Sequence, residues 1–129
     1  MSDNENSLGL TEEDKHHYQE QINNIELEQK EQILKDAPEK VNMLLRREDL
    51  LKYQVTLLKD VTVLYTMLKT IPNLSDIIQK KILFALKYFM DPEDEIPDAL
   101  PDIGLLDDAV VVHWIVDEIK EEYSHYFSA

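Results

Sequence analysis

The sequence predicts an all-α protein, a small single-domain bundle of four to five helices. Three observations lead to this class. The 129 residues contain only two glycines, Gly9 and Gly104, whereas sheet proteins with many tight turns need more. Apolar residues recur at spacings of three and four along most of the chain, which is typical of helices that bury one face. The apolar segments also begin and end at prolines or at residues that cap helices.

The composition fits one globular domain and excludes several kinds of site. Hydrophobic residues make up 43% and charged residues 31% of the chain, as in ordinary soluble domains with a single core. The sequence has no cysteine, which excludes disulfides, thiolate metal sites and cysteine nucleophiles and favours a cytoplasmic location. The start, MSDNENSLGL, lacks the features of a signal peptide, and no uncharged apolar stretch approaches the roughly 18 to 20 residues that span a bilayer.

The net charge of −14 is concentrated at the two ends of the chain. Residues 1–36 hold ten acids and three bases, residues 37–90 five acids and nine bases, and residues 91–129 twelve acids and one base. Phosphate binding needs a concentrated positive surface. We therefore do not expect a nucleic-acid ligand, and a basic partner is favoured instead.

We expect residues 1–10 to form a disordered tail and residues 11–36 to form an N-terminal amphipathic helix. Thr11 and Asp14 have the spacing of a capping box. The apolar stripe of this helix is thin, and consists of Tyr18, Ile22, Ile25 and Ile33. Such a helix must pack on the rest of the domain or on another chain, and packing within the domain is favoured.

Residues 37–129 are expected to form the main helical domain. The segment Asp36-Ala37-Pro38 predicts the end of one helix and the start of the next. Helical spacing then continues to Thr70, and the pattern leaves open whether residues 38–70 form one helix or two with a break near residues 46–49. The pair Ile71-Pro72 predicts the end of this region.

Two strongly apolar helices complete the predicted fold. Ser75 is expected to cap a helix from Asp76 to about Met90, and the apolar residues of this helix cover so much of its surface that it belongs in the middle of the domain. A last major helix is expected from Leu105 to about Tyr123. A corner rich in proline and aspartate joins the two.

This corner carries the most specific pattern in the chain. Residues 88–109 read YFMDPEDEIPDALPDIGLLDDA, which resembles the signature of the YkvA-like family, domain of unknown function (DUF) 1232. The residues that match the family pattern are Pro92, Asp94, Ile96, Pro97, Asp98, Pro101, Gly104, Asp107, Asp108 and Ala109. The resemblance implies a small helical domain, often bacterial, with no established activity. Family members are often described as membrane proteins and commonly have a hydrophobic residue where this chain has Glu95.

One interpretation of the signature is purely structural. Pro92 and Pro97 would end the preceding helix and stiffen the connection, while Asp94 and Asp98 would accept hydrogen bonds from backbone N–H groups in tight turns. Gly104 would supply a positive φ angle or a close approach between backbones. Asp107 and Asp108 would lie in or near the first turn of the last helix, where carboxylates stabilise free N–H groups. We favour this interpretation.

The alternative is a metal site. Asp94, Asp98, Asp107 and Asp108 would converge on a hard cation such as Mg²⁺ or Ca²⁺, and a bound water would act as the nucleophile of a divalent-metal-dependent, hydrolase-like enzyme. The Asp-Asp pair could instead bind Arg46 or Arg47, the only two arginines. An EF-hand is excluded because Ile96 occupies its glycine position.

The sequence favours a noncatalytic helical interaction or adaptor module over an enzyme. It assigns no catalytic residue and no cofactor. His113 is expected to be a core histidine with Asp117, four residues on, as its partner. The expected partner is a protein, a second copy of the chain or a peripheral membrane surface, and the expected location is the cytoplasm or the cytoplasmic face of a membrane.

Overall fold

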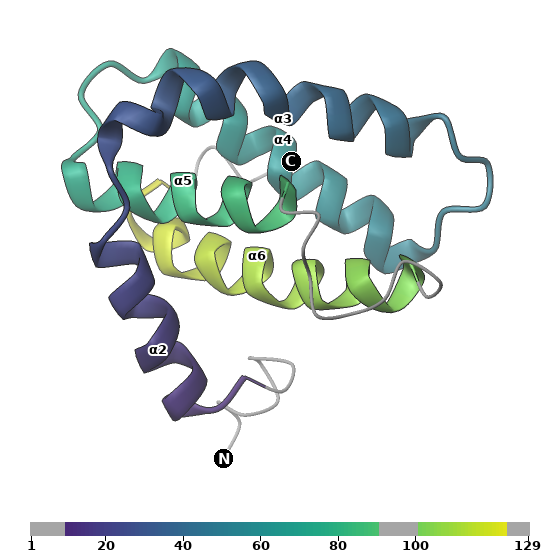
Figure 1. Cartoon of the computed structure of the whole chain (residues 1–129), viewed down its shortest axis with the longest axis horizontal. Helices are drawn as coiled ribbons and strands as arrows, with labels where there is room; N and C mark the ends of the chain where they lie inside the picture. The colour runs from purple at the N-terminus through teal and green to yellow at the C-terminus, as the bar shows by residue number, and fades with distance from the viewer. Residues whose placement is uncertain (1–9, 91–100, 124–129) are drawn as a thin grey trace.

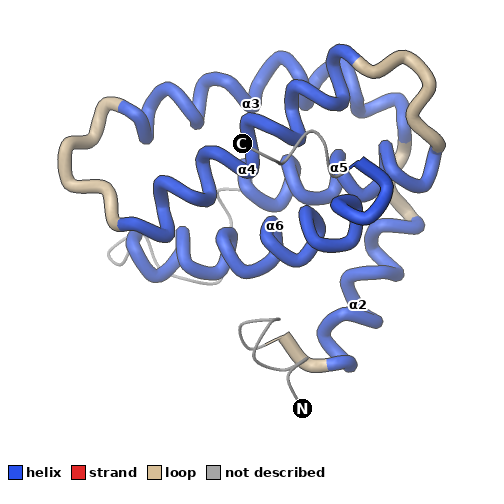
Figure 2. The backbone as a smooth tube through the Cα atoms, turned by 180° about the vertical axis from the view of Figure 1, so that it is seen from behind, coloured by secondary structure: helices blue, strands red, loops and turns tan. Residues whose placement is uncertain are grey.

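The computed structural model of the chain describes residues 10–90 and 101–123, and within these ranges it describes the side chains of residues 10–90 and 108–120. The described part is helical with short connections and contains no strand (Figure 1, Figure 2). In chain order the elements are α2 (Glu12–Asn23), the 3₁₀ turn η1 (Leu27–Gln29), α3 (Lys30–Leu45), α4 (Lys52–Thr70), α5 (Asp76–Met90) and α6 (Pro101–Tyr123). The predicted all-α class is confirmed.

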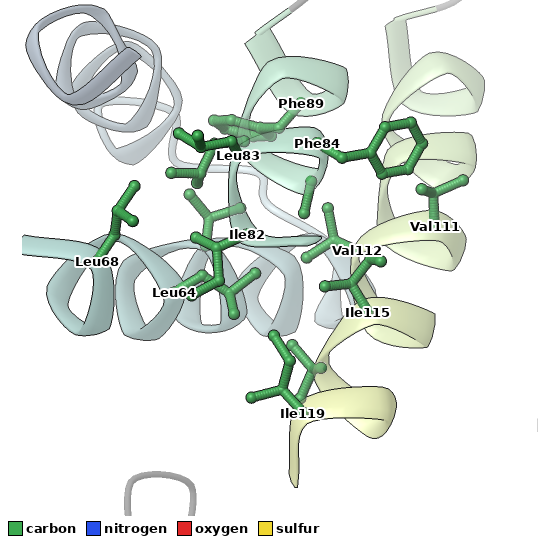
Figure 3. Packing of buried hydrophobic residues seen from close by; sticks show 14 of the residues in the cluster. Leu64, Leu68, Ile82, Leu83, Phe84, Phe89, Val111, Val112, Ile115 and Ile119 are labelled. Atoms are coloured by element: carbon green, nitrogen blue, oxygen red, sulfur yellow. The ribbon is translucent and has the colours of Figure 1, made fainter. Parts of the chain in front are cut away.

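Helix α5 lies at the centre of the bundle. It contacts α2, α3, α4, α6 and η1, and no other element of the described chain has as many neighbours. Figure 3 shows side chains from three helices that point into the shared core: Leu64 and Leu68 of α4, Ile82, Leu83 and Phe89 of α5, and Val112, Ile115 and Ile119 of α6. Each of these side chains is buried, so they supply a large part of the hydrophobic stabilisation. The prediction that this helix occupies the middle of the domain is confirmed.

The N-terminal helix begins where the sequence predicts and ends earlier. The backbone N–H of Asp14 donates to Thr11 Oγ1 at 3.0 Å, and the N–H of Thr11 donates to Asp14 Oδ2 at 3.2 Å, which completes the expected capping box. Helix α2 then ends at Asn23, so the single helix predicted over residues 11–36 is wrong. Asparagine is poorly suited to helix interiors, and the turn at Asn24 allows both Ile22 and Ile25 to be buried.

The predicted tail is also shorter than expected. Leu10 is only 8% exposed and belongs to the hydrophobic core, so the tail does not extend to this residue. Residues 1–9 lie outside the described part of the chain. Burial of Leu10 fixes the start of α2 to the bundle.

The stop predicted at Asp36-Ala37-Pro38 is wrong because Pro38 lies inside α3. A proline in a helix interior removes one backbone hydrogen bond and crowds the preceding turn, at a cost of about 3 kcal/mol. Ile33, Ala37 and Leu44 of α3 are buried on both sides of this proline. We infer that packing of this face against α5 outweighs the local cost.

Residues 38–70 form parts of two helices with a break between them. Helix α3 ends at Leu45 and α4 begins at Lys52, which settles the choice that the sequence leaves open. The N–H of Leu51 donates to Gln54 Oε1 at 2.7 Å, and Gln54 is 1% exposed. A buried glutamine therefore caps α4, a role that the sequence analysis does not assign to it.

The last two helices begin and end where the sequence predicts, except at the start of α6. Ser75 Oγ accepts a hydrogen bond from the N–H of Ile78 at 3.2 Å, and α5 spans the predicted residues Asp76–Met90. Helix α6 extends to Tyr123 as predicted but begins at Pro101 and not at Leu105. Proline suits the first turn of a helix because its missing N–H has no partner there anyway. The earlier start changes the position of the signature aspartates within the helix.

Candidate functional site

The signature residues are only partly within the described chain. Pro92, Asp94, Ile96, Pro97 and Asp98 lie in residues 91–100, outside it. Pro101, Gly104 and Asp107 lie on α6, and their side chains are not described. Gly104 is inside a right-handed helix, so the positive φ angle proposed for it is wrong. Asp108 is the one signature aspartate whose contacts are described.

Asp107 and Asp108 do not lie in the first turn of the last helix. Because α6 begins at Pro101, both follow nearly two turns of helix, where the backbone N–H groups already have partners. The prediction that they cap this helix is therefore wrong. The early start at Pro101 moves the cap position away from them.

Asp108 instead forms a contact between helices. Its side chain is 1% exposed, and its Oδ2 lies 4.0 Å from Nζ of Lys40 on α3. Lys40 Nζ also donates to the carbonyl oxygen of Phe89 at 2.5 Å and lies 4.9 Å from the centre of the Phe89 ring. A cation at the C-terminal end of α5 is stabilised by the helix dipole. We call Lys40, Phe89 and Asp108 the three-helix junction, because they join α3, α5 and α6.

The junction changes the interpretation of the signature. Asp108 pairs with Lys40, and Arg47 pairs with Asp49 at 3.2 Å. The described contact of Asp108 is with another helix, α3. The first Asp of this pair, Asp107, has no described side chain, so the structure assigns it no contact.

The metal hypothesis remains a hypothesis. Within the described residues no group of three or more histidine, aspartate and glutamate side chains could hold a metal ion. This range excludes Asp94, Asp98 and the Asp107 side chain. Asp108 already faces the Lys40 ammonium, so a cation at Asp108 would have to compete with that amine.

A hollow with a volume of about 480 Å³ lies between α4 and α6. This volume is within the roughly 300 to 1,000 Å³ of small-ligand and side-chain pockets. Tyr53, Leu57 and Ala109 form apolar parts of its wall, and the polar lining residues are Lys52, Thr56, Asp60 and His113. We call this hollow the α4–α6 groove. It combines apolar walls with a small set of polar groups, as binding sites commonly do.

His113 joins the two sides of the groove. Its Nδ1 lies 3.6 Å from Asp60 Oδ2 on α4, and its Nε2 lies 3.7 Å from Asp117 Oδ2 on α6. The His113 side chain is 39% exposed and that of Asp60 15%. The sequence prediction that Asp117 is its partner is confirmed, but His113 is partly exposed at a groove and is not a fully buried core histidine.

The environment of His113 favours its charged form. The Asp60 carboxylate beside Nδ1 raises the pKa of His113 above its usual value of 6.5, partial burial opposes this, and the charge of Asp117 raises it further. Lys120 lowers it slightly by repulsion. The sequence analysis does not identify Asp60, because a partner on another helix has no fixed sequence spacing. Asp60 is the one acidic residue of α4, and this was the available signal.

A second, smaller hollow of about 290 Å³ lies beside α2 and η1. Its lining includes Gln21, Gln29, Phe84 and Tyr88. Next to it, the ring of Tyr18 lies 5.7 Å from Phe84, 6.0 Å from Tyr88 and 6.1 Å from Trp114, measured between ring centres. These aromatic contacts hold α2 against α5 and α6, so this region is best explained as packing.

These features define a small all-α bundle protein with a central apolar helix and a buried aspartate in its last helix. Residues 81–114 match the family described as "Protein of unknown function (DUF1232)". The chain therefore carries a DUF1232 segment, and the sequence-based recognition of DUF1232 is confirmed there, while the name YkvA-like is not tested. No curated protein and no solved structure matches the chain.

The matched segment contains both Asp108 and His113. It spans the second part of α5 and about the first half of α6. None of the described helices is long and apolar enough to cross a membrane.

Proposed function

We propose that this protein is a noncatalytic helical interaction module that binds a protein partner in the α4–α6 groove. The observation that carries the proposal is the groove itself, with about 480 Å³ of space between two helices and with Tyr53, Leu57 and Ala109 in its wall. A partner helix commonly places one or two apolar side chains in a groove of this kind. Thr56 and Lys52 are exposed beside the groove and are available for polar contacts at the rim.

The described polar residues support a noncatalytic role. Asp108 is buried and opposite Lys40, which suits a structural contact and not a group that approaches a substrate. Both ring nitrogens of His113 face carboxylates. Because both nitrogens are turned towards carboxylates of the chain itself, neither is directed at a substrate proton.

Photo-crosslinking from the groove tests this proposal. p-Benzoylphenylalanine would replace Thr56, an exposed residue of the groove, or Thr66, an exposed residue of the same helix outside the groove lining. The full-length protein would be irradiated in cells that contain its native partners. We expect a discrete crosslinked protein from position 56 and not from position 66. Ala109→Trp, which fills the groove, should remove the product without lowering the melting temperature by more than a few degrees.

Each other outcome is informative. A product of twice the chain mass would identify a second copy as the occupant, and flotation with lipid vesicles that requires an open groove would identify a membrane surface. Equal products from positions 56 and 66, or none from either, would contradict the groove as the binding site.

A further inference from the structure

The position of His113 indicates what the partner brings to the groove. The imidazole lies between Asp60 of α4 and Asp117 of α6, with nitrogen-to-oxygen distances of 3.6 and 3.7 Å. These distances are longer than those of good charge-assisted hydrogen bonds, which are about 2.7 to 2.9 Å. The contacts are therefore ion pairs at a loose separation. The two carboxylates belong to different helices and lie on opposite sides of the imidazole.

The charged groups nearest to the imidazole are the two carboxylates, and two lysines lie further out. The titratable groups that face His113 are Asp60 from α4 and Asp117 and Lys120 from α6, and Lys52 of α4 also lines the groove. The whole chain has a net charge of −14, so a basic partner is attracted over long distances as well. His113 is the group of the described residues that lies between the two carboxylates, so their charges are not neutralised there when it is uncharged.

The apolar wall next to the carboxylates fits the stem of a basic side chain. Asp60 and His113 line the same groove as Leu57 and Ala109. Arginine and lysine place their methylene groups along apolar surface and keep the charged end at polar groups. A guanidinium group also matches carboxylates in geometry, because it can donate two parallel hydrogen bonds to one of them.

We infer that the groove binds a basic amphipathic segment of its protein partner, and that an arginine or lysine of this segment takes the place of His113 between Asp60 and Asp117. This inference rests on the proposed function and adds the chemistry of the partner. The side chain of His113 is exposed by more than a third, so it has room to rotate away. In the free protein, His113 acts as an internal substitute for the partner's cation.

Displacement of His113 by the partner's basic side chain makes binding depend on pH in one direction. An incoming guanidinium repels the charged imidazole, so the bound state favours neutral His113 and releases a proton. Binding that releases a proton becomes tighter as pH rises through the pKa of the free state. The affinity should therefore increase from about pH 5.5 to about pH 8.5, because arginine remains charged throughout this range.

Titration with small probes tests the inference without a known partner. Hexylguanidinium has the charged end and apolar stem of the proposed side chain, and hexylurea is its neutral counterpart of similar shape. Binding would be followed by NMR chemical shifts of His113, Leu57 and Ala109 in the full chain. We expect hexylguanidinium to bind at least about fivefold more tightly than hexylurea at pH 8, and this preference to fall at acidic pH.

Matched variants separate the parts of the inference. Asp60→Asn and Asp117→Asn should remove the preference for the charged probe, whereas Glu39→Gln, which changes an exposed acid on α3, should keep it. His113→Gln should bind the charged probe with little dependence on pH. Circular dichroism would establish that each variant is folded.

The outcomes distinguish the inference from the proposed function. Equal binding of the two probes in the groove would overturn the basic partner and leave the groove as a binding site. A preference for the charged probe that does not change with pH would overturn the displacement of His113. Absence of groove binding by either probe, together with no crosslink from position 56, would contradict both the inference and the proposed function.

Discussion

Lys40 on α3 and Asp108 on α6 face each other across the end of α5, with Nζ and Oδ2 4.0 Å apart. The lysine is 23% exposed and the aspartate 1%. Lys40 also donates to the carbonyl oxygen of Phe89. One cation therefore compensates a buried carboxylate and one end of the central helix, and its removal should affect three helices together.

Lys40→Met tests this junction. The variant keeps most of the lysine's apolar volume but leaves the Asp108 carboxylate without its cation, and breaking such a buried pair costs about 3 to 5 kcal/mol. We expect a loss of this size in the free energy of unfolding, measured by urea denaturation at neutral pH. Lys35→Met, at an exposed position of the same helix, should change it by no more than about 0.5 kcal/mol. Equal effects of the two substitutions would show that the contacts of Lys40 in the junction add no more to the free energy of unfolding than an exposed lysine does.

The His113 contacts should stabilise the fold mainly at acidic pH. The folded-state pKa of His113 is raised by Asp60, so its contribution is fully present below the unfolded value of 6.5 and is lost as pH rises through the folded pKa. Partly exposed ion pairs contribute about 0.2 to 1 kcal/mol after solvent screening. We expect His113→Gln to lower the free energy of unfolding at about pH 5.5 and to change it little at about pH 8.5. A larger effect at the higher pH would contradict the assignment.

Tyr18 should be the main anchor of α2. Its ring lies near Phe84, Tyr88 and Trp114, and removal of a large aromatic side chain costs about 3 to 5 kcal/mol when it is fully buried and less here, where burial is partial. We expect Tyr18→Ala to change the fluorescence of Trp114, the only tryptophan, and to speed amide exchange in residues 12–23. Glu13→Ala, at an exposed position of the same helix, is the control. If amide exchange is unchanged in Tyr18→Ala, other contacts hold α2.

Pro38→Ala should stabilise α3. The substitution restores a backbone N–H inside the helix, where proline costs about 3 kcal/mol relative to alanine. Part of this gain is offset because proline also restricts the unfolded chain, by about 0.4 to 1 kcal/mol. We expect a net rise of about 2 to 2.6 kcal/mol in the free energy of unfolding. A decrease would show that the proline ring makes packing contacts that alanine cannot replace.

Divalent cations should not stabilise the protein. The hypothetical metal site consists of Asp94, Asp98, Asp107 and Asp108. One of these ligands, Asp108, already lies opposite the Lys40 ammonium, with which a metal ion would have to compete. Millimolar Mg²⁺, Ca²⁺ or Mn²⁺ should produce neither heat in calorimetric titration nor a rise in melting temperature. A rise that Asp107→Asn abolishes would instead support the metal-dependent enzyme.

The sequence predicts the ends of helices where a local signal determines them. Thr11, Ser75 and the Ile71-Pro72 pair act through neighbouring backbone groups, and the helices begin or end there. The central position of α5 also follows from the sequence, since a helix with apolar residues over most of its surface must be surrounded. Local chemistry was enough for these features.

The sequence fails where packing between helices outweighs a local preference or brings distant residues together. Pro38 continues a helix because the residues around it are buried on α5. Asp108 has the local character of a helix cap, and only the folded chain places it opposite Lys40. Asp60 likewise meets His113 through the contact of α4 with α6. No spacing within the sequence specifies either pair.

Lys40 lies outside residues 81–114, whereas Phe89 and Asp108 lie within them. The segment shared with DUF1232 therefore contacts a lysine of an earlier helix, and excising the segment alone would separate Asp108 and the Phe89 carbonyl from Lys40. Chimeras that transplant this segment into another scaffold should carry α3 with it, or exchange Asp108 for a neutral residue at the same time.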